Sequence, residues 1–240
     1  MNRLFYCDHL SDGEFKIEGE DHRHSIKVLR LKKGDQIDVI DGTGYIYQCQ
    51  IASINKKELI ASIQSKILQF PLPYSLSIAI SPLKNPSRFE WFLEKSTEIG
   101  ISEIYPIQCK RTEKPGIKYD RSRKIIHSAM KQSLQAYEPT LNPVMKLNEF
   151  AELNNESFKI IAYINENVHL TLSQIDLPPQ QNYTIVIGPE GGFTQEEAGF
   201  MMDLGFQAVS LGNSRLRTET AAIAACQIIK TLEERRMKSN

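Results

Sequence analysis

The sequence predicts an α/β protein with two domains, a small N-terminal β-barrel and a larger C-terminal domain built on a parallel sheet. Residues 1–70 contain short β-branched runs separated by turn residues, whereas strand-like and helix-like segments alternate from residue 74 onward. Between the two regions, Phe70-Pro71-Leu72-Pro73 stiffens the chain and prevents a helix from continuing. We therefore expect domains at 1–70 and 74–240.

The first domain is expected to contain a β-hairpin. Segments 36–40 and 45–51 read as strands, and Asp41-Gly42-Thr43-Gly44 between them is a typical hairpin turn. Segment 59–63 offers a further strand. A partly open barrel is the expected form of these strands.

The second domain is expected to alternate strands with helices, which implies a parallel sheet covered on both faces. Ser87 with Glu90, and Thr194 with Glu197, match the capping box that begins a helix, and Gly100 is placed to end one. The predicted strands are 76–80, 104–107, 160–164, 184–187 and 208–211, and the predicted helices are 87–99, 121–136, 194–204 and 218–236.

Two glycine-rich loops follow the last two predicted strands. The first is Gly188-Pro189-Glu190-Gly191-Gly192-Phe193-Thr194, and the second runs from Leu211 to Ala221. Glycine has no Cβ, so backbone approaches a ligand closely, and ligands of open α/β sheets bind beyond the carboxyl ends of strands. Neither loop matches G-x-x-x-x-G-K-[ST] or G-x-G-x-x-G. We expect the loops to form one pocket, the alternative being that each only marks a turn.

The composition excludes several classes of protein. A hydrophobic fraction of 41% with a charged fraction of 24% is typical of an ordinary globular protein. The four cysteines show no C-x-x-C spacing, which argues for a reducing compartment and against a metal site. No apolar run approaches the roughly 20 residues that span a bilayer, and no signal-peptide core is found at the start. We expect a cytoplasmic protein without a metal or a membrane anchor.

The charge is balanced overall but unevenly distributed. The net charge is zero, from 29 basic and 29 acidic residues, whereas a nucleic-acid binder usually has a basic surface. Basic side chains nevertheless cluster at 22–33 and at 110–124. These clusters are either two solvated faces or two patches that contact phosphates.

Taken together, these features resemble the ribosomal RNA small subunit methyltransferase E family of the SPOUT superfamily. The resemblance extends over essentially the whole chain, and the two glycine-rich loops are its strongest part. The supporting motifs are His24 with Val28-Leu29-Arg30 and Gly34, Arg88 with Lys95-Ser96-Thr97-Glu98-Ile99-Gly100, and Gln132-Ser133 with Pro139. The chain departs from the family at Gln135, where an Arg is usual, and around Arg111-Thr112-Glu113, which is a loose match.

The resemblance implies a PUA-like RNA-binding barrel followed by a SPOUT domain with a trefoil knot, although knots are otherwise rare in proteins. It implies S-adenosylmethionine as cofactor, N3 of a uridine in 16S ribosomal RNA as the methyl acceptor, and a homodimer with its active site at the subunit interface. It also implies an RNA partner within the small ribosomal subunit. Because N3 lies on the Watson-Crick edge, the uridine must be unpaired or extruded.

The candidate residues fall into three groups. Arg217 is expected to stabilise the imide anion, with a salt bridge to Glu190 or Glu219 as its alternative, and Glu190 or Glu219 is expected to accept the proton. The cofactor candidates are Ile187, Gly188, Pro189, Gly191, Gly192, Leu211, Gly212, Leu216 and Thr220. The RNA-binding candidates are Arg3, His24, Arg30, Lys84, Arg88, Arg111, Gln132 and Ser133.

Two other functions fit the same sequence. One is a SPOUT enzyme that methylates a ribose 2′-hydroxyl, and the other is a ribosome-assembly factor that binds RNA without catalysis. The N-terminal barrel and the Glu-Gly-Gly loop favour the base methyltransferase over the first, and the intact cofactor loop argues against the second.

Overall fold

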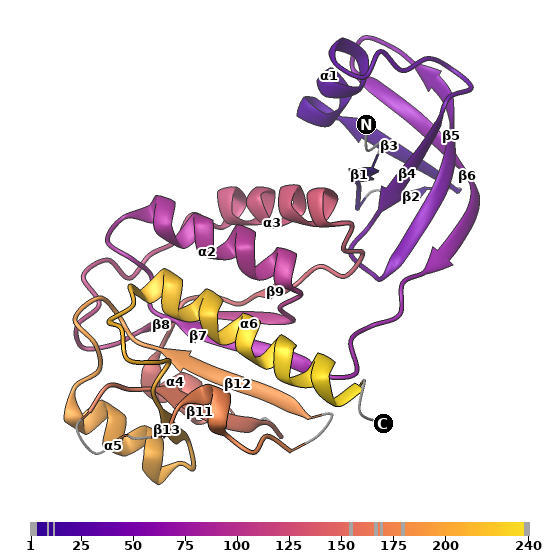
Figure 1. Ribbon diagram of the computed structural model, residues 1–240. Helices are drawn as coiled ribbons and strands as arrows, with labels where there is room; N and C mark the ends of the chain where they lie inside the picture. Colours follow the sequence, from indigo (N-terminus) through magenta and orange to yellow (C-terminus); the bar gives the residue numbers. More distant parts are fainter. Residues whose placement is uncertain are drawn as a thin grey trace. The chain divides into compact units, whose positions relative to one another are not determined.

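The computed structural model describes residues 4–8, 10–11, 13–153, 156–165, 168, 170–178 and 181–237. The chain forms two compact units (Figure 1). Unit 1 comprises Met1–Pro71 with His127–Glu138, and unit 2 comprises Leu72–Ile126 with Pro139–Asn240. The domain boundary at 70–74 stays a prediction. The compact units differ from the predicted domains because the segment 127–138 belongs to unit 1.

Unit 1 is a six-stranded sheet of order β1-β4-β5-β6-β3-β2. All neighbours are antiparallel except β1 and β4, which are parallel. The predicted hairpin is confirmed as β4 and β5, and shifts of register between β5 and β6 bend the sheet around a core that includes Phe15, Val39 and Leu59. The elements are β1 (Leu4–Tyr6), β2 (Leu10–Ser11), β3 (Glu14–Glu18), α1 (Gly19–Lys27), β4 (Gln36–Ile40), β5 (Tyr45–Ile54) and β6 (Glu58–Leu68).

The segment 127–138 is held in unit 1 by side chains from the barrel. Tyr6 stacks on His127 with ring centroids 3.5 Å apart and donates a hydrogen bond to Glu138 at 2.6 Å. Lys131 forms an ion pair with Asp21 at 2.8 Å. The second half of α3 (Tyr119–Ser133) therefore belongs to unit 1, although the predicted boundary places it in the second domain.

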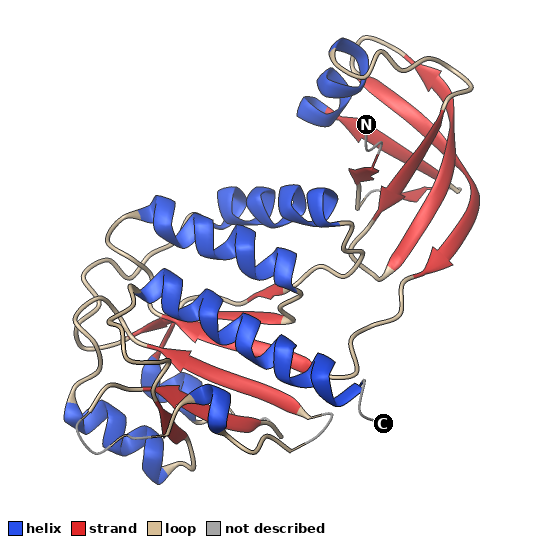
Figure 2. Cartoon of the chain, in the orientation of Figure 1, coloured by secondary structure: helices blue, strands red, loops and turns tan. Residues whose placement is uncertain are grey.

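Unit 2 is an α/β unit whose sheet has the order β10-β8-β7-β12-β11-β13, with β9 paired to β8 and all pairs parallel. Helices α2 and α6 cover one face, and α4 and α5 cover the other (Figures 1 and 2). The elements are β7 (Ser75–Ile80), α2 (Pro86–Ile99), β8 (Glu103–Gln108), β9 (Thr140–Leu141), β10 (Met145–Lys146), α4 (Leu147–Ala151), β11 (Phe158–Ala162), η1 (Leu172–Gln174), β12 (Asn182–Ile187), α5 (Gln195–Asp203), β13 (Gln207–Val209) and α6 (Thr218–Met237).

Alternation along the central strands separates the two cores of unit 2. Ala79 of β7 and Val186 of β12 point toward α4 and α5, where they pack with Phe150 and Met201. Their strand neighbours, such as Ile185, are equally buried on the opposite side of the sheet. A parallel sheet buried on both faces is what the β-branched run at 184–187 predicts.

The helix ends correct two predictions and confirm two. Ser87 does not begin its helix, because Asn85 accepts a hydrogen bond from the Ser87 amide and Pro86 occupies the first helical position. Gly100 ends the same helix with φ of 103°, and Thr194 caps α5 in a capping box with Glu197. Helix α3 stops at Ser133, short of the predicted 136, where Leu134 turns to φ of 60°.

The short helix α1 was not predicted, since its residues were interpreted only as a basic cluster. Its His22 is buried, with Nε2 3.1 Å from the carbonyl oxygen of Asn55, so it is unavailable to a phosphate. His24 in the same helix is exposed. The described part of the chain has no helix long and apolar enough to cross a membrane.

Gly199 in α5 offers a stability prediction. No atom lies within 4 Å of the position that a Cβ would take, and the backbone is ordinary helix. Gly199→Ala should therefore raise the free energy of unfolding by about 0.5–1 kcal/mol, because alanine costs less conformational entropy in a helix. Urea unfolding followed by the fluorescence of Trp91, the single tryptophan, checks this in unit 2. An unchanged or lower midpoint would contradict it.

Candidate functional site

A cavity of about 1310 Å³ lies beyond the carboxyl ends of β11, β12 and β13 in unit 2. It is lined by residues 162–165 after β11, 187–193 after β12, and 211–218 after β13, together with Arg88 and Arg111. Since ligand pockets usually measure about 300–1,000 Å³, the cavity has room for a cofactor and a second group. The two glycine-rich loops thus lie at one cavity, as the strand order requires.

The loop after β12 is tightly packed on its inner side. A Cβ on Gly188 would lie 3.0 Å from the ring of Phe193, which is itself buried in the core. The amide of Gly192 donates to the carbonyl of Pro189 at 2.8 Å, and Gly192 has φ of 69°, a conformation that favours glycine. At its glycines the loop therefore presents only backbone to the cavity.

The loop after β13 is joined to the first by a hydroxyl. The Thr218 hydroxyl donates to the carbonyl of Gly188 at 3.1 Å. Gly212 has φ of 123° and is held by hydrogen bonds with the Ser210 side chain. The two loops are thus connected by a hydrogen bond as well as being neighbours.

The cofactor candidates lie at this cavity with one difference. Thr220 does not line it and sits in the first turn of α6, where the neighbouring Ala221 contributes to the wall instead. The candidates that line the cavity are Ile187, Gly188, Pro189, Gly191, Gly192, Leu211, Gly212 and Leu216. Their role in cofactor binding stays a prediction.

Of the three catalytic candidates, Arg217 and Glu190 line the cavity and are exposed. The Arg217 guanidinium has no hydrogen bond or ion pair with any side chain of the described residues, so neither alternative salt bridge forms. Glu190 accepts one hydrogen bond, from the Lys84 amide at 3.1 Å. Both groups are therefore available to a ligand.

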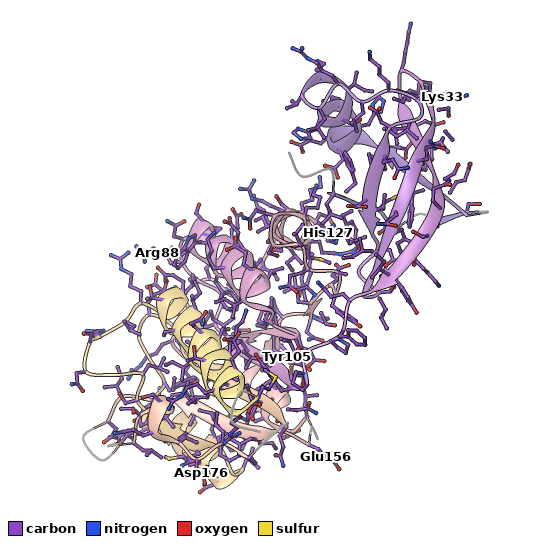
Figure 3. The ribbon with its side chains drawn as sticks, turned by 45° about the vertical axis from the view of Figure 1, so that its right-hand side comes forward. Lys33, Arg88, Tyr105, His127, Glu156 and Asp176 are labelled. Carbon is purple, nitrogen blue, oxygen red and sulfur yellow. The ribbon has the colours of Figure 1, made fainter. Side chains whose placement is uncertain are left out.

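Glu219 differs from Glu190, because it is buried. Its Oε1 lies 3.6 Å from Nε of Arg88, and its Oε2 is buried without a hydrogen-bond partner among the described residues. Arg88 lies in the first turn of α2 (Figure 3), and it is one of the residues that line the cavity. The Glu219 carboxylate is thus placed to orient Arg88. Its Oε2 can accept a hydrogen bond from a further donor.

The RNA-binding candidates divide between the units. In unit 1, His24 and Arg30 are exposed, and Arg30 has φ of 53°, an uncommon conformation for a residue other than glycine. Gln132 is exposed, and the Ser133 hydroxyl bonds back to Ala129 within α3. Arg3 lies outside the described residues.

In unit 2, several basic side chains in and near the second basic cluster, residues 110–124, form ion pairs with carboxylates. Lys84 pairs with Glu113 at 2.8 Å, which raises the pKa of Lys84, although both side chains are exposed and the pair contributes little stability. Lys110 pairs with Glu196, and Arg121 with Glu90. The Arg111 guanidinium donates to the carbonyls of Gly191 and Phe193, so it is bonded to protein backbone in this structure.

Sequence reasoning missed Tyr163, Ile164 and Asn165, which line the cavity after β11. The strand was predicted to run to Ile164, but it ends at Ala162 and leaves these three residues at the sheet edge. Ile164 is 75% exposed, which leaves an apolar surface at the cavity. Only the strand order, with β11 between β12 and β13, could have indicated them.

Among the described residues, the site has neither a cluster of metal-binding side chains nor a reactive thiol. The described residues include no group of three or more His, Cys, Asp or Glu placed to hold a metal ion. Burial raises the pKa of the nearby Cys109 thiol to about 12, with the Glu197 carboxylate adding to the shift, so this thiol stays protonated at neutral pH. The charged side chains that line the cavity include those of Glu190, Arg215 and Arg217.

Comparison with known proteins defines the class. A family model described as an RNA methyltransferase domain matches residues 70–230, and one described as an RNA methyltransferase PUA domain matches residues 17–64. The α/β unit with its loop-lined cavity and the curved sheet of unit 1 are thus those of an RNA methyltransferase with a PUA domain.

Relatives narrow the class. The chain is 31% identical over 241 residues to the ribosomal RNA small subunit methyltransferase E of Buchnera aphidicola, covering 96% of this chain and 93% of that one. The crystal structure of the Neisseria gonorrhoeae protein of the same name, bound to S-adenosyl methionine, is 29% identical with a TM-score of 0.82, covering 97% and 98%. A probable rRNA-methyltransferase from Porphyromonas gingivalis is 35% identical with a TM-score of 0.87, covering 98% and 99%. The chain belongs to the ribosomal RNA small subunit methyltransferase E family.

Proposed function

We propose that this protein transfers the methyl group of S-adenosylmethionine to N3 of a uridine in 16S ribosomal RNA. The observation that supports this best is one cavity lined by both glycine-rich loops, in a chain that matches RNA methyltransferase and PUA family models. The proposed RNA substrate is taken from the names of the relatives, and the proposed cofactor from the neisserial structure that contains S-adenosyl methionine. The N3 position rests on the family resemblance.

The residues at the cavity fit S-adenosylmethionine. Gly188, Gly191 and Gly212 line the cavity without a side chain of their own, and Leu211 and Leu216 provide an apolar wall for an adenine. Thr220, in the first turn of α6, is also proposed to bind the cofactor. When bound, the cofactor supplies an electrophilic methyl group, and the main task of the protein is to align the acceptor with it.

The acceptor nitrogen must lose its proton, and two side chains of the cavity suit this step. Arg217 is exposed and has no side-chain partner among the described residues, so its guanidinium can donate to the uracil oxygens as negative charge develops on the imide. Glu190 is the better placed of the two carboxylates to accept the N3 proton, directly or through water, because it lines the cavity while Glu219 is buried beside Arg88. Glu219 then acts by orienting Arg88.

The proposal extends to the partners and the remaining architecture. The N-terminal barrel is proposed to contact RNA phosphates through His24 and Arg30. The other proposed RNA contacts are Arg3, Lys84, Arg88, Gln132 and Ser133. From the family resemblance we include a homodimer, a trefoil knot in the SPOUT domain at 74–240, and action in the cytoplasm on the small ribosomal subunit. Phosphate contacts of this kind predict RNA binding that weakens steeply with salt.

The test of the reaction is nucleoside mass spectrometry of ribosomal RNA. A strain lacking this gene should lose 3-methyluridine from 16S ribosomal RNA, and purified protein with S-adenosylmethionine should restore it. Re-expression of the intact gene is the control for secondary effects of the deletion. Loss of a 2′-O-methyl nucleoside instead would favour the ribose methyltransferase, and an unchanged nucleoside profile would favour the non-catalytic assembly factor.

A further inference from the structure

The loop after β8, residues 109–112, is bonded to the loop after β12 at several points. Lys110 and Arg111, which are consecutive, supply the bonds from one side. The acceptors are the carbonyls of Gly191 and Phe193 and the carboxylate of Glu197 at the start of α5. All of these groups belong to unit 2.

Glu197 is the centre of the first connection. It is only 8% exposed, and each of its carboxylate oxygens accepts a hydrogen bond from a different loop. Oε1 accepts from the Lys110 amide at 2.6 Å, and Oε2 accepts from the Thr194 amide at 2.8 Å. A capping box needs only the bond to Thr194, so the bond to Lys110 has no role in starting the helix.

Arg111 makes the second connection. Its Nη1 donates to the Gly191 carbonyl at 2.7 Å and lies 3.4 Å from that of Phe193. A Cβ on Gly191 would lie 3.3 Å from both Cβ and Cδ of Arg111, so the absence of a side chain at 191 lets the arginine lie against the loop. A side chain at this position would therefore displace Arg111 as well as alter the cofactor loop.

The loop after β8 is itself held in place. The Thr112 hydroxyl accepts from the Cys109 amide at 2.9 Å and lies 2.8 Å from the Ser81 hydroxyl, which follows β7. Lys110 and Arg111 therefore project from a fixed turn, and their bonds can restrain the glycine-rich loop. Without such restraint, glycines at 188, 191 and 192 would leave that loop many conformations.

We propose that Glu197 and Arg111 are positioning residues that hold the 188–194 loop in the shape that binds S-adenosylmethionine. This inference rests on the proposed function. It assigns Arg111 to the cofactor loop rather than to an RNA phosphate. Neither side chain needs to touch the cofactor, since both act through the backbone of the loop.

The variant Glu197→Gln separates the connection between the loops from the helix cap. The glutamine oxygen can still accept from Thr194, as capping boxes with Gln do, but its amide group then faces the Lys110 N–H, and two donors cannot bond. We expect the Kd for S-adenosylmethionine, measured by calorimetry, to rise about tenfold. The kcat at saturating cofactor should stay within about twofold, because the binding shape can still be reached at high concentration.

Two control variants match this change. Thr194→Ala removes the capping hydroxyl and destabilises the start of α5, yet it keeps the backbone amide that bonds to Glu197. Glu196→Gln removes the neighbouring carboxylate, which pairs with the Lys110 side chain at the surface. Both should leave the cofactor Kd within about twofold, since both keep the Lys110–Glu197 and Arg111–Gly191 hydrogen bonds, and the exposed Lys110–Glu196 pair that Glu196→Gln removes contributes little.

The variant Arg111→Lys distinguishes the two roles of that residue. Lysine keeps the positive charge for a phosphate but loses the planar group that reaches the loop carbonyls. We expect a several-fold weaker Kd for S-adenosylmethionine, with the salt dependence of RNA binding unchanged. Weaker RNA binding with an unchanged cofactor Kd would overturn the assignment of Arg111.

The outcomes separate this inference from the proposed function. A wild-type protein that binds S-adenosylmethionine, with Glu197→Gln binding it equally well, overturns the positioning role and leaves the proposed function intact. A wild-type protein that does not bind the cofactor overturns both. A rise in Kd with Thr194→Ala equal to that with Glu197→Gln would show that helix stability alone is responsible, which also overturns the inference.

Discussion

Arg217→Ala should reduce methyl transfer by about 10²–10³-fold while leaving S-adenosylmethionine binding nearly unchanged. The guanidinium lines the cavity, is exposed, and has no side-chain partner among the described residues, so its removal breaks no hydrogen bond or ion pair with them. Without the guanidinium, the negative charge that develops on the uracil imide during transfer would lose its stabilising hydrogen bond. Transfer of a labelled methyl group to ribosomal RNA gives kcat, and calorimetry gives the cofactor Kd.

The matched control for this variant is Arg235→Ala. Arg217 directly precedes α6 and Arg235 lies near the other end of this 20-residue helix, which is about 30 Å long. The same charge is removed far from the cavity, so methyl transfer should be unaffected. Near-normal transfer by Arg217→Ala would contradict the catalytic role, and an equal loss with Arg235→Ala would point to a general effect of charge.

The local features of the fold could be predicted because they depend on neighbours in the sequence. Thr194 and Glu197 are three residues apart and form the predicted capping box. The wrong cap at Ser87 shows the limit of such reasoning, since Asn85-Pro86 just before it provides an equally suitable start, and the choice depends on where the chain turns. Strand ends were similarly misjudged at β11, which stops two residues early.

Long-range contacts were beyond prediction. Residues 127–138 belong to unit 1 through Tyr6 and Asp21, more than a hundred positions away, and nothing in the segment itself indicates this. The same reason explains the unexpected bonds of Arg111. A basic residue in a basic cluster predicts a phosphate contact, whereas the carbonyls that it actually meets come from a loop 80 residues later.

The site itself was predictable to the extent that it depends on strand ends. Two glycine-rich loops, each after a buried strand of one parallel sheet, lie at one cavity because carboxyl ends share an edge. The buried position of Glu219 and the contribution of residues 163–165 required the structure. The roles of the individual side chains await the variants described above.

Gly188→Val should abolish measurable binding of S-adenosylmethionine. A Cβ at this position would lie 3.0–3.2 Å from three ring atoms of Phe193, and the two further methyl groups of valine need still more room. Phe193 is only 6% exposed and packs in the core with Ala198 and Met201, so it cannot move aside cheaply. The loop must shift instead, and the hydrogen bond from Thr218 to the Gly188 carbonyl, which joins the two loops, is lost.

Gly188→Ala and Gly116→Val make this prediction specific. Alanine requires Phe193 to yield by only a few tenths of an ångström, so it should weaken binding less than valine does. Gly116 is exposed, has no atom within 4 Å of a Cβ position, and accepts the same valine without contact. Calorimetry on the three variants, with circular dichroism to confirm folding, should rank the affinities as Gly116→Val, then Gly188→Ala, then Gly188→Val. Wild-type affinity in a folded Gly188→Val protein would mean that the loop after β12 does not hold the cofactor.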